Sequence, residues 1–146
     1  KKKYTAFEQK MIYYKLNLLN LTEKEWYGSR MCKLKHLKSP QWLRNKKVKL
    51  YPFYRFDKID WNIINNGGWH FSNIMTPNDI SEKIKSFAHS EFNTPEFTNI
   101  ENIKEKIRLK KDLFGRKFEL EKITQEEDLP KYINENQKKF SEFLLK

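Results

Sequence analysis

The sequence predicts an α/β fold in which a mixed sheet is flanked by helices. Of the 146 residues, 38% are hydrophobic and 15% are aromatic, which is enough apolar surface for a core. The N-terminal half contains runs of aromatic and branched residues, which are typical of strands. The C-terminal half contains two capping boxes followed by apolar residues at helical spacing. No repeat or linker divides residues 1–146, so we expect one domain, or most of one.

The first third is expected to form two strands. Residues 11–18 are rich in aromatic and branched side chains and favour a strand, with a helix as the competing interpretation. A possible helical turn precedes them from Phe7. After a turn at residues 22–25, residues 26–37 partly alternate between polar and apolar side chains. The two strands could pair as a hairpin.

The middle of the chain is expected to contain a short helix and a tight turn. Ser39 followed by Pro40 is a helix-start signal, which predicts a helix over residues 41–45. Residues 46–56 interleave lysines with aromatic residues, a pattern of half-buried loops or edge strands that also suits stacking on nucleic-acid bases. Pro52 argues against a central strand there. Residues 65–68, Asn-Asn-Gly-Gly, indicate a turn before a strand.

Two further helices and a strand are expected in the second half. Thr76 and Asp79 form one capping box, and Thr98 and Glu101 form the other. Gly115 is placed to end the second helix. A short strand at residues 118–123 and a C-terminal helix at about residues 129–145 complete the prediction. The side chains expected in the core of these helices are Ile80, Ile84 and Phe87, then Ile100, Ile103 and Ile107, and finally Ile133, Phe140 and Leu144.

Positive charge is concentrated in the first third of the chain. The net charge is +11, and residues 1–50 hold 14 lysines and arginines against 3 aspartates and glutamates. Such a basic face attracts an anionic sugar-nucleotide donor, and it is equally typical of nucleic-acid binding or of solvated surface. Only Arg30 and Arg44 are arginines in this stretch, which favours loose attraction of anions over base-specific recognition.

The cysteine count and the hydropathy exclude other classes of site. Cys32 is the single cysteine, so an internal disulfide and a thiolate metal cluster are excluded. No apolar run approaches the roughly 18 residues of a membrane span. Neither observation fixes the compartment.

The stretch Gly67-Gly68-Trp69-His70-Phe71-Ser72 is the most informative about function. Two glycines precede an indole, an imidazole and a hydroxyl, which together suit a sugar or nucleotide site. Because side chains alternate across a strand, Trp69 and Phe71 should face one side, and His70 and Ser72 the other. The alternative interpretation is that Trp69 and His70 are a packed pair in the core.

Five short stretches, taken in order, carry a family resemblance. They are Glu25-Trp26-Tyr27-Gly28, Ser39-Pro40-Gln41-Trp42-Leu43-Arg44, Gly67-Gly68-Trp69-His70-Phe71-Ser72, Ser86-Phe87-Ala88-His89-Ser90-Glu91-Phe92-Asn93 and Lys111-Asp112-Leu113-Phe114-Gly115-Arg116. They resemble successive blocks of the glycosyltransferase family 17 domain, over about residues 7–116. This family is similar to the transferase that adds the bisecting N-acetylglucosamine to N-glycans.

The resemblance implies a fold, a reaction and partners. The fold would be of the GT-A type, and the reaction would transfer a sugar from a UDP-sugar to a glycan acceptor with inversion. A divalent metal, Mn²⁺ or Mg²⁺, is also implied. Nucleic acid is not among the partners that the resemblance implies, and the family allows a Golgi-membrane or a cytoplasmic location.

One departure from the family is the absence of an Asp-x-Asp element, which holds the metal and the donor diphosphate in transferases of this fold. The nearest acidic pair, Asp57 and Asp60, has the wrong spacing. We therefore expect this chain to correspond to the C-terminal half of the domain, with the main metal ligands outside it. Catalysis by these residues alone is not expected.

The resemblance also suggests roles for individual residues. His70 is expected at the metal or the donor phosphate, and Glu91 is expected to be the catalytic base, with a core histidine and a solvated glutamate as the alternatives. His89 is a weaker candidate than His70. The expected substrate-binding residues are Trp26 and Trp69 for stacking, Ser72 for hydrogen bonding, and Arg108, Lys111 and Arg116 for the diphosphate.

A second hypothesis comes from a different class of protein. The basic first third and its interleaved aromatic residues also fit a small nucleic-acid-binding module. The salt dependence of DNA binding distinguishes the two hypotheses, because binding to a polyanion weakens steeply as ionic strength rises.

Overall fold

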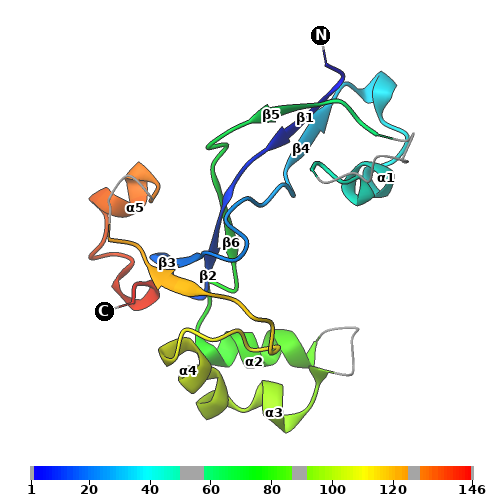
Figure 1. Ribbon diagram of the computed structural model, residues 1–146. Coiled ribbons are helices and arrows are strands. Elements are labelled where there is room, and N and C mark those ends of the chain that lie inside the picture. The colour runs from blue at the N-terminus through cyan, green and yellow to red at the C-terminus, as the bar shows by residue number, and fades with distance from the viewer. Residues whose placement is uncertain (1, 50–57, 87–91, 125–128, 146) are drawn as a thin grey trace. The chain divides into compact units, whose positions relative to one another are not determined.

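The computed structural model describes residues 2–49, 58–86, 92–124 and 129–145 (Figure 1). They form a mixed α/β structure with flanking helices, as the sequence predicts, and the strands form two sheets instead of the one that was expected. The chain divides into two compact units. The first unit contains residues 1–10 and 25–68, and the second contains residues 11–24 and 69–146.

The first unit is built on a three-stranded sheet with β1 (Tyr4–Phe7) in the centre. β4 (Arg30–Cys32) pairs with β1 in antiparallel orientation, and β5 (Trp61–Ile64) pairs with it in parallel orientation (Figure 1). Tyr4 lies opposite Cys32 on one side and Trp61 on the other. The N-terminal strand is therefore held by two segments that are distant in sequence.

A short helix, α1 (Pro40–Asn45), covers part of this sheet's core. Its start is fixed by Ser39, whose hydroxyl accepts a hydrogen bond from the Trp42 amide at 3.0 Å. That cap and the proline after it confirm the helix that the sequence predicts. Among the residues that the structure describes in this unit, the buried core cluster contains Ala6, Leu43 and Trp61.

The second unit contains a four-stranded sheet in the order β6 (Trp69–Ser72), β2 (Lys10–Tyr13), β3 (Leu18–Asn20) and β7 (Leu120–Lys122). β3 pairs in antiparallel orientation with both β2 and β7. β7 confirms the short strand expected within residues 118–123. Strands from both ends of the chain thus meet in one sheet.

Three helices pack together in the second unit: α2 (Pro77–Lys85), α3 (Pro95–Thr98) and α4 (Ile100–Arg108) (Figure 1). Thr76 caps α2 in the predicted capping box with Asp79. Burial of each branched core side chain contributes about 1.5–3 kcal/mol relative to exposure. The core on which these helices pack contains Tyr13, Tyr14, Leu18, Ile80, Ile84, Ile103, Ile107, Leu113 and Leu120.

The C-terminal segment differs from the single long helix expected at about residues 129–145. It forms α5 (Lys131–Glu135) and, after an interruption, a 3₁₀ helix at Ser141–Phe143. The break follows Asn136, whose φ of −123° is not helical. Ile133 is buried with Leu16 and Leu129, so the apolar residues of the segment still form a core cluster.

The predicted strands of the first third are shorter than expected. β2 ends at Tyr13 because Tyr14 adopts a left-handed conformation with a φ of 62°, which a continuous strand does not allow. Within residues 26–37 only β4 is a strand, and a 3₁₀ helix follows it at Leu34–His36. The expected hairpin is wrong, because β4 pairs with β1 rather than with residues 11–18.

Two predicted helix ends are also corrected. α4 is capped by Asn99 instead of Thr98, because the Asn99 side chain accepts hydrogen bonds from two amides of the first turn. The Thr98 hydroxyl donates instead to the Thr94 carbonyl within α3. α4 ends at Arg108, well before Gly115, and Lys110 follows it with a φ of 54°. None of the helices in the described residues is long and apolar enough to cross a membrane.

Candidate functional site

The Asn-Gly-Gly turn before β6 depends on its glycines. A Cβ on Gly67 would lie 2.8 Å from the Cβ of Phe7, closer than real Cβ contacts allow. Gly68 has a φ of +117°, which L side chains rarely adopt. The turn therefore explains why two glycines stand directly before the Trp-His-Phe-Ser strand.

On β6 the side chains of Trp69, His70 and Ser72 are half-buried, and Phe71 is exposed. Burial holds the pKa of the His70 imidazole below its usual value of 6.5, and the Glu23 carboxylate opposes that shift. The imidazole is therefore neutral at pH 7. A neutral imidazole can accept a proton or hydrogen-bond to a ligand.

A buried carboxylate lies at the centre of the second unit's main polar cluster. Asp112 is 2% exposed and accepts a hydrogen bond from the Tyr13 hydroxyl at 2.9 Å. The Arg116 guanidinium donates to both Asp112 oxygens, at 2.7 and 3.1 Å. The backbone amides of Phe114 and Arg116 donate to the same carboxylate at 2.9 and 3.0 Å. The negative charge of Asp112 is thus balanced by the Arg116 guanidinium and by several hydrogen-bond donors.

Two side chains extend this arrangement toward β6. The Asn73 amide donates to the Tyr13 hydroxyl at 3.2 Å, and Lys83 donates to the Asn73 side-chain oxygen at 2.9 Å. Arg116 also donates to the Tyr13 hydroxyl, at 2.8 Å. Asn73 has a φ of 55°, a left-handed conformation that asparagine tolerates better than most residues. We call Tyr13, Asn73, Lys83, Asp112 and Arg116 the Tyr13 cluster.

Interactions within the Tyr13 cluster determine the protonation states of Asp112 and Tyr13. Burial alone would raise the pKa of Asp112, but hydrogen bonds from Arg116 and Tyr13 outweigh it and hold the pKa below its usual 3.8. Burial and the Asp112 charge raise the pKa of Tyr13 to about 12. Asp112 is therefore ionised at neutral pH, and Tyr13 carries its proton.

Arg116 is the accessible cation of the cluster. Half of its side chain is exposed, although the Asp112 carboxylate is fully buried. Its guanidinium also lies 4.2 Å from the centre of the Phe118 ring. The charge of Glu23 acts on both Arg116 and His70.

The other residues predicted for the site have different positions. Glu91 and His89 lie outside the described residues. Arg108 is on the surface, where its guanidinium forms two hydrogen bonds with Glu105, at 2.6 and 2.8 Å. Lys111 is exposed next to the buried Asp112.

Trp26 belongs to the first unit, whereas Trp69, His70, Ser72 and Arg116 belong to the second. A Cβ on Gly28 would lie 1.7 Å from the Trp26 ring, so the indole packs directly over this glycine. This contact gives a structural reason for the Trp-Tyr-Gly sequence. A stacking role for Trp26 stays a prediction.

The metal that the resemblance implies is not supported by a ligand cluster in this part of the chain. Within the described residues, no three side chains of His, Cys, Asp or Glu are grouped to hold a metal ion. A role for His70 as a metal ligand stays a prediction.

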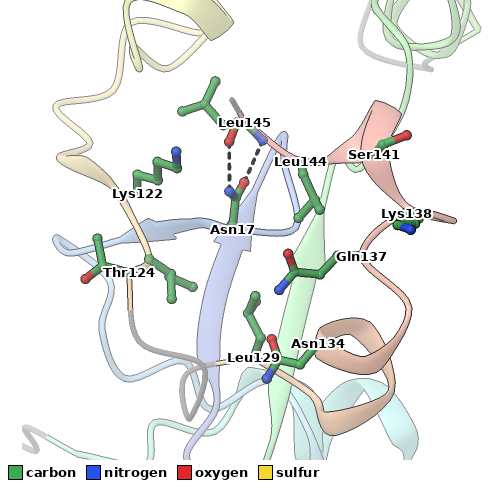
Figure 2. A pocket seen from close by; sticks show the side chains of 11 residues that line it. Asn17, Lys122, Thr124, Leu129, Asn134, Gln137, Lys138, Ser141, Leu144 and Leu145 are labelled. Atoms are coloured by element: carbon green, nitrogen blue, oxygen red, sulfur yellow. Dashed lines mark hydrogen bonds between the residues drawn. The ribbon is translucent and has the colours of Figure 1, made fainter.

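The second unit also contains a pocket of about 610 Å³, shown in Figure 2. Asn17 fixes one wall by pairing with the backbone of Leu145, with hydrogen bonds of 2.7 and 3.0 Å (Figure 2). The lining combines amide, hydroxyl and ammonium groups with apolar side chains: Lys122, Thr124, Asn134, Gln137, Lys138 and Ser141, with Ile123, Leu129, Leu144 and Leu145.

Sequence reasoning missed several members of this neighbourhood. Asp112 and Arg116 are four residues apart in one block, a spacing that could have indicated an ion pair. Tyr13 is 99 residues from Asp112, and no sequence signal connects them. Asn73 directly follows the Trp-His-Phe-Ser strand and could have been included in that motif. No sequence pattern indicated a role for Glu23 in the site.

Comparison with known proteins finds no relative of this chain. No family model, no curated protein and no solved structure matches the chain.

Proposed function

We propose that this chain is the C-terminal part of an inverting glycosyltransferase with a GT-A type fold. It would transfer a sugar such as N-acetylglucosamine from a UDP-sugar to a glycan acceptor. The observation that carries the proposal is a set of hydrogen bonds at the Tyr13 hydroxyl, which join one family-like block to the residue directly after another. Asn73, which follows the Trp69–Ser72 strand, and the block with Asp112 and Arg116 both bond to the Tyr13 hydroxyl.

The charges of the Tyr13 cluster suit a diphosphate. Arg116 is half-exposed and its guanidinium is fixed by Asp112, so it can meet an anion with little reorganisation. Lys83 is held next to Asn73 on the same cluster. In the proposed reaction, these cations stabilise the negative charge that develops on the leaving UDP.

The proton of the acceptor hydroxyl needs a base, because inversion proceeds by direct attack of that hydroxyl on the anomeric carbon. Glu91 remains the base suggested by the family resemblance. The neutral imidazole of His70, with the Glu23 carboxylate in its electrostatic neighbourhood, is a second group able to take this proton. Either group would act on a donor whose phosphates lie at Arg116.

The pocket of Figure 2 supports an acceptor role for the second unit. A sugar ring presents hydroxyls at its edge and an apolar face, and the pocket offers both kinds of partner. Gln137 and Ser141 supply hydrogen-bonding groups, and Leu129 and Leu144 supply apolar surface.

Replacing His70 by alanine tests the proposal. In the intact protein, His70→Ala should lower the turnover of UDP-N-acetylglucosamine with an N-glycan acceptor by about two orders of magnitude or more. The melting temperature should change little, because His70 is only half-buried. His36→Ala is the matched control, since His36 lies in the first unit, and it should retain full turnover. Equal turnover of the two variants would remove His70 from the reaction.

A further inference from the structure

The first unit contains a pocket of about 490 Å³ that collects positive charge. Five lysines line it: Lys2, Lys3, Lys38, Lys46 and Lys58. Among the described residues that line it, Asp60 is the one carboxylate, and it pairs with Lys2 at 2.8 Å. The lining therefore carries a clear excess of ammonium groups over carboxylates. Such a concave cationic surface attracts anions.

Two of these ammonium groups share one aromatic ring. The Nζ atoms of Lys38 and Lys46 lie 5.3 and 5.4 Å from the centre of the Trp42 ring. Both distances are within the range of cation–π attraction. Both cations therefore lie around the Trp42 ring, and their charges together attract an anion.

Aromatic surface is the second property of the pocket. Tyr4 and Trp42 both line it, with ring centres 5.8 Å apart. The Tyr4 hydroxyl donates to the backbone carbonyl of His36 at 2.9 Å, which fixes the ring. Partial desolvation, together with the charges of Lys3 and two neighbouring lysines, holds the pKa of His36 below its usual value.

We propose that this pocket binds a nucleoside phosphate, with its phosphate at the ammonium groups of Lys38 and Lys46 and its base against the aromatic rings of Trp42 and Tyr4. Lysine ammonium groups act as point charges and do not read base identity, so binding is independent of sequence. The nucleoside phosphate is either a free nucleotide or one residue of a single-stranded nucleic acid. The site lies wholly in the first unit and does not depend on the transferase proposal.

The test compares two double variants of equal charge. Lys38→Gln/Lys46→Gln removes the two ammonium groups at Trp42, and Lys33→Gln/Lys35→Gln removes two exposed lysines of the same unit that do not line the pocket. Binding is measured by the fluorescence anisotropy of a labelled oligothymidylate at low salt, with UMP as competitor. Circular dichroism confirms that each variant is folded.

We expect the pocket variant to bind the oligothymidylate about tenfold or more weakly, and the control variant to stay within about twofold of the parent protein. The slope of log K against log salt should decrease by about 1.4 in the pocket variant, because two phosphate contacts are lost. Lys46→Arg, which keeps the charge, should retain binding.

UMP distinguishes the two sources of the ligand. If UMP competes as well as the strand does per nucleotide, the pocket binds a free nucleotide; if the strand binds far better, the pocket binds a polynucleotide. Either result supports the proposal. Equal losses in the pocket and control variants would overturn it, as would the absence of binding of both probes at about 50 mM salt.

Discussion

The two units of this chain use charge in different ways. The first unit has 14 lysines and arginines and 4 aspartates and glutamates, a net charge of +10, whereas the second has 16 and 15, a net charge of +1. In the first unit, most of the described lysines are exposed. In the second, the charge of Asp112 is buried and bonded to Arg116 and Tyr13.

Because of this difference, the first unit is suited to attract anions, whereas the second is suited to hold an anion in a fixed orientation. Flexible surface lysines raise the local concentration of anions but do not fix their orientation. A guanidinium held by a buried carboxylate has one orientation, which chemistry at a phosphate requires. Tyr14, which follows Tyr13 in the chain, and Asn73, a member of the Tyr13 cluster, adopt left-handed conformations. Such conformations are often found at functional sites.

The largest effect that the comparison predicts is the loss of the buried carboxylate. Asp112→Ala should lower the free energy of unfolding by about 3–5 kcal/mol, because it leaves Arg116 and the Tyr13 hydroxyl without their partner. Urea denaturation measures this change. The control is Glu105→Ala, which breaks an exposed pair with Arg108 and should cost less than about 1 kcal/mol. Equal losses would show that the Tyr13 cluster is no more important than a surface pair.

The pH dependence of unfolding gives a second test of the buried interactions of Asp112 and Tyr13. Because the pKa of Asp112 lies below 3.8 in the folded state, its contribution is present above that value and is lost as the pH falls further. Because the pKa of Tyr13 is raised from 10.0 to about 12, its contribution is lost as the pH rises between those values. We expect a loss of about 3 kcal/mol over the alkaline range.

Thermal unfolding from pH 2 to 12 measures both effects. Asp112→Asn should remove the acid-side loss that Asp112 causes, and Tyr13→Phe should remove the alkaline loss that Tyr13 causes. Unchanged pH profiles in both variants would contradict the assignment.

A smaller effect is expected at Tyr14. Its hydroxyl accepts a hydrogen bond from the Leu113 amide at 2.7 Å in the buried core. Tyr14→Phe leaves that amide without this partner and should cost about 1–2 kcal/mol. Tyr132→Phe is the control, because the Tyr132 ring is exposed and its hydroxyl bonds only weakly to Lys139 at 3.2 Å. Chemical denaturation of both variants tests the difference, and a loss at Tyr132 as large as at Tyr14 would contradict it.

Local signals in the sequence predicted the local parts of the fold. The caps at Ser39 and Thr76 define α1 and α2 because each needs only a hydroxyl and the amides of the next turn. Thr98 and Asn99 are adjacent, and both could cap a helix. Sequence could not decide that Thr98 would end α3, with its hydroxyl bonded to the Thr94 carbonyl, and that Asn99 would cap α4.

Long-range features were not predictable in the same way. The pairing of β1 with both β4 and β5, and the bond between Tyr13 and Asp112, join residues that are far apart in the sequence. The sequence identified Trp69, His70, Ser72 and Arg116 as candidates. It could not show that Arg116 bonds to the Tyr13 hydroxyl, or that the charge of Glu23 acts on His70 and Arg116.

The most direct test of the proposed transferase site follows the histidine ring signals by ¹⁵N NMR as UDP-N-acetylglucosamine is added with Mg²⁺. Variants at His36 and His70 assign the signals, and the Lys38→Gln/Lys46→Gln background removes the basic pocket of the first unit. The account predicts that the His70 signals shift and saturate in this background. If the His70 signals remain unchanged at every concentration of the sugar nucleotide, the second unit does not bind the donor at His70 and Arg116.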